Sequence, residues 1–103
     1  MNSLSWLQRW YERQCDGTWE HAYGIKIETL DNPGWHVQIN LVGTPHDSAV
    51  RETAADNSET DWLRCSIQNR LFNGYGDPGK LEKIIEVFRG WVEPTASEAP
   101  GNP

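Results

Sequence analysis

The sequence predicts an α+β fold: an N-terminal helix, an antiparallel sheet of about four strands in two hairpins, and a C-terminal helix packed on the sheet. Two observations indicate this class. Apolar residues recur at helical spacing near both ends of the chain, and they alternate with polar residues in the middle. The length of 103 residues suits one domain with one modest core, which we expect to span residues 1–92.

The first helix is predicted to begin at Ser3, whose hydroxyl can cap it. Asp16-Gly17 predicts its end, because glycine readily adopts the left-handed angles that follow a last helical turn. Its apolar residues recur three or four positions apart in one wide stripe: Leu4, Trp6, Leu7, Trp10 and Tyr11. We therefore expect this helix to bury much of its circumference.

The stretch from Trp19 to Leu41 is predicted to form the first hairpin. Two alternating runs flank Asp31-Asn32-Pro33-Gly34, whose residue types favour a turn. Pairing Ile27 with Val37 places the apolar residues of both runs on one side of the sheet, whereas a slip of one residue would expose one set to water. The apolar side then needs a cover, which the two helices can supply.

A second hairpin is predicted further along the chain. Ser48 to Ala55 has weak strand character, Asp56 to Thr60 has the composition of a turn, and Asp61 to Asn69 alternates clearly. The apolar residues of the last run share one face: Leu63, Cys65 and Ile67. This pattern predicts a strand with one buried face.

The last part of the domain is predicted to be a bend followed by a helix. Asn73 to Gly76 is rich in glycine, and Asp77 can then cap a helix that has Pro78 at its first position. The apolar stripe of this helix is continuous: Leu81, Ile84, Ile85, Phe88, Trp91 and Val92. Residues 93–103 are small, polar and rich in proline, so they are predicted to be a disordered tail.

The formal net charge is −6 and the isoelectric point is about 4.9. This acidity disfavours binding to nucleic acid or to an anionic membrane, and it permits a basic partner protein. No segment is long and apolar enough to span a bilayer, and no signal peptide is visible, so a cytoplasmic protein with free thiols is expected.

One segment combines a thiol, two carboxylates and an imidazole. In it, Cys15 is a possible nucleophile, His21 a possible base, and Asp16 or Glu20 a possible orienting group. The alternative function is therefore a small thiol-dependent enzyme of the sulfurtransferase type. The bland interpretation is a helix cap and a turn. No metal site and no cofactor are predicted, because the histidines lack the spacing of metal ligands.

An acidic set in the second hairpin and just before it has two interpretations: Asp47, Glu52, Asp56, Glu59 and Asp61. These residues either keep the hairpin soluble or dock a basic protein. Trp62 alternates with the apolar face of its strand, so it is expected to point away from the core. An exposed tryptophan is typical of an interface anchor, although a helix can also cover it.

Five parts of the chain carry a resemblance to a known family: Trp6 to Tyr11, Cys15 to His21, Gly24 to Trp35, Asp61-Trp62, and the region from Phe72 to Trp91. In these parts the sequence resembles the immunity protein 53 family of bacterial polymorphic-toxin systems. The resemblance implies a small cytoplasmic protein that binds a cognate toxin and blocks it, without catalysis. The acidity fits a basic toxin such as a nuclease.

Exposure and charge then suggest where the toxin binds. The expected contact residues are Asp16, Glu20, His21, Asp31, Asn32, Asp56, Glu59, Asp61 and Trp62. Turn chemistry accounts for Asn32 and for the neighbouring proline and glycine, but it does not account for Glu20 and His21. Those two residues are therefore the stronger candidates.

Overall fold

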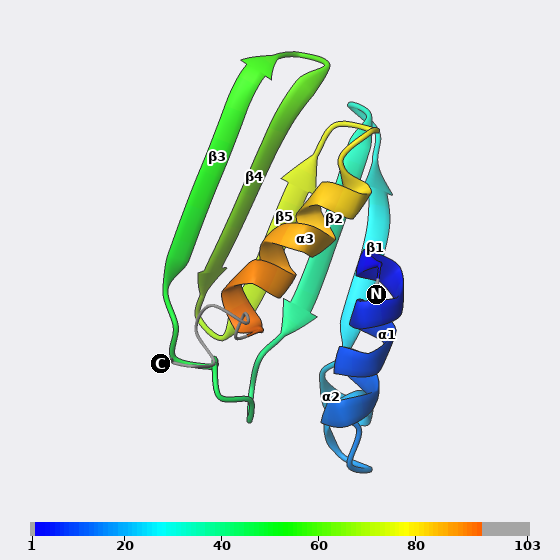
Figure 1. Cartoon of the computed structure of the whole chain (residues 1–103), viewed down its shortest axis with the longest axis vertical. Helices are drawn as coiled ribbons and strands as arrows, with labels where there is room; N and C mark the ends of the chain where they lie inside the picture. The colour runs from blue at the N-terminus through cyan, green and yellow to red at the C-terminus, as the bar shows by residue number, and fades with distance from the viewer. Residues whose placement is uncertain (1, 94–103) are drawn as a thin grey trace.

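The computed structural model describes residues 2–93 and contains a five-stranded sheet with two long helices on one of its faces (Figure 1). The elements follow in this order: α1 (Ser3–Gln14), α2 (Trp19–Ala22), β1 (Ile25–Leu30), β2 (Gly34–Asn40), β3 (Arg51–Ser58), β4 (Asp61–Gln68), β5 (Leu71–Gly76) and α3 (Leu81–Val92). All neighbouring strands are antiparallel, in the spatial order β1-β2-β5-β4-β3. The predicted α+β class is confirmed.

The first hairpin has the predicted register, with Ile27 opposite Val37. Its first strand begins later than expected, because Trp19–Ala22 forms the short helix α2 and the strand begins at Ile25. Trp19 is still buried, since it packs edge-on against Trp10 of α1 with 5.9 Å between ring centroids. The short helix thus directs this ring toward α1 and not into the sheet.

The sheet has five strands where about four were predicted, because Leu71–Gly76 forms β5 between β2 and β4. A bend was expected here, since glycine is uncommon inside strands. A Cβ at Gly74 would overlap the side chain of Ile84, and one at Gly76 would lie 2.6 Å from the Cβ of Lys80. The two glycines therefore let α3 and the residue before it approach β5 closely. Figure 1 shows α3 lying over β5.

The core between the sheet and the helices is built largely from aromatic rings. Phe88 of α3 contacts Trp10 of α1 edge-on, with 5.0 Å between ring centroids, and it contacts Phe72 of β5 at 4.9 Å. All three side chains are buried. Each large ring can bury about 150–250 Å². A few aromatic residues therefore fix both helices against the sheet.

The ends of the two long helices differ in detail from the prediction. Asn2, not Ser3, caps α1, and its side-chain oxygen accepts a hydrogen bond from a first-turn amide at 2.8 Å. Glu93, the first residue of the predicted tail, directly follows α3 and accepts a hydrogen bond from the Trp6 indole at 2.8 Å. The rest of that tail, residues 94–103, lies outside the described residues.

The second hairpin forms as predicted, but its first arm begins and ends three residues later than the predicted range of 48–55. The strand β3 runs to Ser58, so Asp56 lies in the strand opposite Trp62 and not in the turn. Every residue of β3 is exposed, because it is an edge strand and neither helix reaches over it (Figure 1). Both long helices lie on the same side of the sheet. Its other side, here called the bare face, has no helix over it within residues 2–93.

Candidate functional site

The residues predicted to contact a partner fall into two groups at opposite ends of the molecule (Figure 1). Asp16, Glu20 and His21 lie where α1 leads into α2. The second group occupies the ends of the two hairpins: Asp31, Asn32, Asp56, Glu59, Asp61 and Trp62. The two groups are therefore separate surfaces.

The carboxylates of Asp16 and Glu20 hold the connection between α1 and α2. Asp16 accepts hydrogen bonds from the amides of Thr18 and Trp19, both at 2.9 Å. Glu20 accepts from the amides of Asp16 and Gly17, at 2.9 and 2.7 Å. The pKa of Asp16 is lowered by the Trp19 and Thr18 amides, and backbone amides, its own foremost, lower the pKa of Glu20. This reciprocal capping gives both residues a structural role that needs no partner.

Among the described residues, neither thiol has the hydrogen bond by which a neighbouring base would activate it. The Cys15 thiol donates to the carbonyl oxygen of Tyr11 at 3.3 Å. Within residues 2–93, no hydrogen bond joins His21 to Cys15 or to a carboxylate. Cys65 is buried, and this burial raises the pKa of its thiol to about 12. Neither thiol therefore has the arrangement expected of a catalytic nucleophile.

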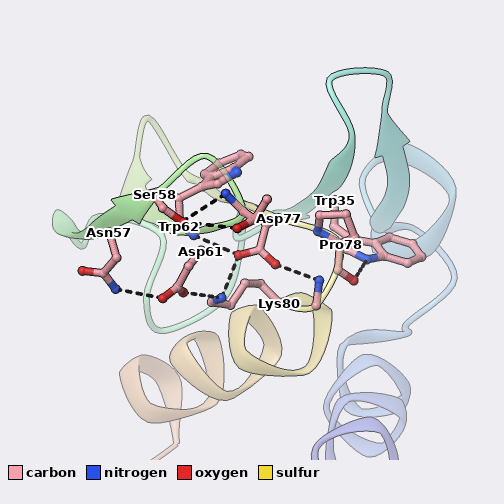
Figure 2. A network of polar contacts seen from close by, with 10 residues as sticks. Trp35, Asn57, Ser58, Asp61, Trp62, Asp77, Pro78 and Lys80 are labelled. Atoms are coloured by element: carbon pink, nitrogen blue, oxygen red, sulfur yellow. Dashed lines mark hydrogen bonds and ion pairs between the residues drawn. The ribbon is translucent and has the colours of Figure 1, made fainter.

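A polar network joins the start of β4 to the turn before α3 (Figure 2). The Lys80 ammonium lies 2.8 Å from Asp61 and 2.7 Å from Asp77. Asp77 also accepts hydrogen bonds from the amides of Trp62 and Gly79, both at 2.8 Å. These donors, Lys80 foremost, lower the pKa of Asp77 to about 2. Asp61 is thus engaged within the chain.

The role of Asp77 differs from the prediction, which made it the cap of a helix beginning at Pro78. The helix α3 begins at Leu81, and Asp77 lies in a turn closed by a hydrogen bond of 3.0 Å from the Lys80 amide to its carbonyl oxygen. Its side chain is buried and binds the strand β4. An aspartate before Pro-Gly is compatible with a turn as well as a cap, so the sequence alone does not separate the two.

The bare face is hollowed between the two hairpins, with a volume of about 950 Å³. Four of the predicted contact residues line this hollow, although they come from different hairpins: Asn32, Asp56, Glu59 and Trp62. Tyr75 of β5 and Leu30 of β1 line it as well. The structure thus brings part of the second predicted group together, while Asp31 and Asp61 are not among the lining residues.

Three carboxylates that line the hollow have no hydrogen bond or ion pair within residues 2–93. They are Glu52, Asp56 and Glu59. Other acidic side chains nearby are satisfied inside the chain: Glu28, for example, lies 3.0 Å from the His36 ring. The three unpaired carboxylates therefore give the hollow its negative character.

A stacked pair of rings stiffens the floor of the bare face. The His36 ring stacks on Tyr75, with 4.4 Å between centroids and 8° between planes. Its nitrogens also lie 3.0 Å from Glu28 and 2.9 Å from Asn73. The register of the first hairpin places His36 opposite Glu28. Tyr75 had no predicted role, because it was assigned to a bend. Its ring is held in a fixed orientation beside the hollow.

The described residues show neither a metal cluster nor a membrane span. No group of three or more His, Cys, Asp or Glu side chains among them is placed to hold a metal ion. No helix in that part of the chain is long and apolar enough to cross a membrane.

The fold and the hollow define a small α+β domain with one bare, aromatic and acidic sheet face, which is a surface suited to binding another molecule. The chain belongs to the immunity protein 53 family, whose model matches residues 4–93. This match confirms the resemblance seen in the sequence. Comparisons with curated proteins and with solved structures gave no match.

Proposed function

We propose that this protein binds a cognate bacterial polymorphic toxin and neutralises it by stoichiometric occlusion. Membership of the immunity protein 53 family is the observation that carries this proposal. Occlusion requires a rigid surface and no chemistry of its own. The activity proposed is therefore binding, and the protein is not proposed to be an enzyme.

The bare face of the sheet and the adjoining hairpin ends are the proposed contact surface. A stable complex buries about 800 Å² on each partner, so a whole sheet face offers enough area. Trp62 and Tyr75 are partly exposed there and are fixed by their strands. Aromatic residues of this kind supply much of the binding energy in protein interfaces. The unpaired acidic residues then favour a basic toxin and speed the encounter.

The test is co-expression with the toxin encoded by the neighbouring gene, together with titration of the purified proteins. We expect growth to be rescued, and we expect inhibition to be complete at one molecule of this protein per toxin molecule. Cys15→Ser should protect as well as the wild-type protein, since the thiol has no part in occlusion. Protection at strongly substoichiometric amounts, or its loss in Cys15→Ser, would favour the thiol-enzyme alternative. Absence of both rescue and binding would refute the proposal.

A further inference from the structure

The hollow on the bare face has a defined construction. Its two sides are the first hairpin, through Leu30 and Asn32, and the strand β3 of the second hairpin. The strand β5 lies between them and stops at Gly76, where the chain turns away toward the face that holds α3 (Figure 1). The hollow is therefore an open trough, flanked by two hairpins and backed by the packed core.

Aromatic side chains and small side chains determine what fits into this trough. Trp62 and Tyr75 line it with ring surfaces, and Tyr75 is held in place by stacking on His36. Arg64 lies opposite Tyr75 on one side and opposite Ala54, a small residue of β3, on the other. The lining thus offers aromatic rings against which a flat group can pack.

The charge in the trough decides the sign of that group. The carboxylates of Glu52, Asp56 and Glu59 line it without partners in residues 2–93, and Arg64 is the basic residue set against them. An arginine guanidinium is flat, stacks on aromatic faces and donates several hydrogen bonds to carboxylates. It matches both the rings and the charge of the trough better than a lysine does.

We propose that the trough binds an extended segment of the toxin that carries arginine side chains. Identifying this occupant as part of the toxin rests on the proposed function. The guanidinium groups stack on Trp62 or Tyr75 and bind the carboxylates of β3. Arg64 opposes this binding, so its effect has the opposite sign to that of the acidic residues.

The first experiment needs no toxin. Short capped glycine–serine peptides that carry arginine, lysine or glutamate are titrated into the ¹⁵N-labelled protein, and the Trp62 indole and Ala54 amide are followed. We expect the arginine peptide to bind most tightly. Asp56→Asn should weaken the binding of the arginine peptide by about two- to fivefold, which corresponds to the loss of one exposed ion pair. Arg64→Gln should tighten it by a similar factor.

The matched control for charge is Glu82→Gln, which removes a carboxylate from the exposed side of α3, away from the bare face. It should leave the affinity unchanged. Trp62→Ala should weaken binding by about fivefold or more, and Trp62→Phe should recover part of that loss. Thermal melts of each variant establish that it is folded. Equal binding of the arginine and glutamate peptides, or weaker arginine binding by Arg64→Gln, would overturn the inference.

The second experiment uses the toxin itself and separates the two proposals. If the wild-type protein neutralises the toxin and Asp56→Asn and Trp62→Ala weaken the complex, both proposals are supported. If those variants bind the toxin as tightly as Glu82→Gln does, the trough is not the contact site and only this inference fails. If the wild-type protein does not bind the toxin, the proposed function is refuted, and a toxin segment is not the occupant of the trough.

Discussion

At the scale of single residues, the aspartates of this chain differ in whether their carboxylates are hydrogen-bonded within the chain. Asp77 is buried and bound by three donors, and Asp16 caps a turn. Asp56 lies exposed on an edge strand and has no partner within residues 2–93. A carboxylate that the fold satisfies contributes to stability, whereas an exposed unpaired one remains available to another molecule.

The structural role of Asp77 predicts a pH-dependent loss of stability. Its pKa falls from 3.8 to about 2 on folding, so the charged form is favoured in the folded state. The stabilisation is therefore complete above about pH 4 and is lost as the pH falls through about 2. Asp77→Asn should lower the melting temperature at pH 7. The difference in melting temperature between this variant and the wild-type protein should become smaller between pH 4 and pH 2. Thermal denaturation followed by circular dichroism across this range measures both effects.

The matched control for that experiment is Asp31→Asn, at an exposed turn position without a side-chain partner in the described residues. It should leave the melting temperature nearly unchanged at every pH. A gap between Asp77→Asn and the wild-type protein that stays constant down to pH 2 would contradict the role given to the Asp77 carboxylate.

At the scale of elements, the sequence predicted what local pattern determines and missed what packing determines. The register of the first hairpin followed from alternation and from the turn at residues 31–34, and it was correct. The strand β5 was missed because Gly74 and Gly76 are residues typical of a turn. In the structure they lack a side chain where Ile84 and Lys80 pack closely against the strand. The short helix α2 was missed because its four residues are too few for a helical period to show.

For the candidate site as well, local sequence pattern predicted single residues, and contacts between distant parts of the chain were missed. Trp62 could be identified because alternation along its strand shows which side chains face away from the core, and Asp56 was proposed from its charge within a predicted turn. It could not be predicted that Trp62, Asp56 and Asn32 line the same hollow, because this depends on β5 lying between the two hairpins. The capping role of Glu20 was also missed, because it depends on the fold of the α1–α2 connection.

Close packing of α3 on β5 predicts opposite effects for two glycine substitutions. Gly74→Ala places a methyl group against Ile84 and should lower the free energy of unfolding by about 1–3 kcal/mol. Gly90→Ala lies within α3 and meets nothing within 4 Å, so it should raise that free energy by about 0.5–1 kcal/mol. Urea denaturation at constant pH measures both. Equal effects of the two substitutions would argue against the close approach.

The connection between α1 and α2 predicts a loss of stability without a loss of function. Glu20→Ala removes the acceptor for the Asp16 and Gly17 amides, so the melting temperature should fall by several degrees. Toxin affinity below that temperature should be unchanged, because this end of the molecule lies away from the bare face. Glu12→Ala, on the exposed side of α1, is the control and should alter neither property. A weaker toxin complex for Glu20→Ala alone would place this end in the interface.

At the scale of the whole molecule, the elements that stabilise the fold lie on the side of the sheet opposite the proposed contact surface. The helices, the aromatic core and the capped turns occupy one side of the sheet, and the other side carries unpaired charge and partly exposed rings. The net charge of −6 acts over the whole molecule, whereas the trough concentrates part of it at one place. Long-range charge governs the rate of encounter, and local contacts govern the lifetime of the complex.

This separation predicts how charge variants affect the kinetics of toxin binding. Glu52→Gln combined with Asp56→Asn removes two charges at the trough, so the association rate should fall by up to about tenfold at low salt. Above physiological salt the difference should shrink, because charges are screened beyond about 8 Å at 0.15 M. The matched double variant Glu12→Gln with Glu82→Gln removes the same charge from the helices and should slow association much less. Stopped-flow association measured at several salt concentrations distinguishes these cases. If both double variants slow association equally, the effect comes from net charge alone, and the trough does not direct the encounter.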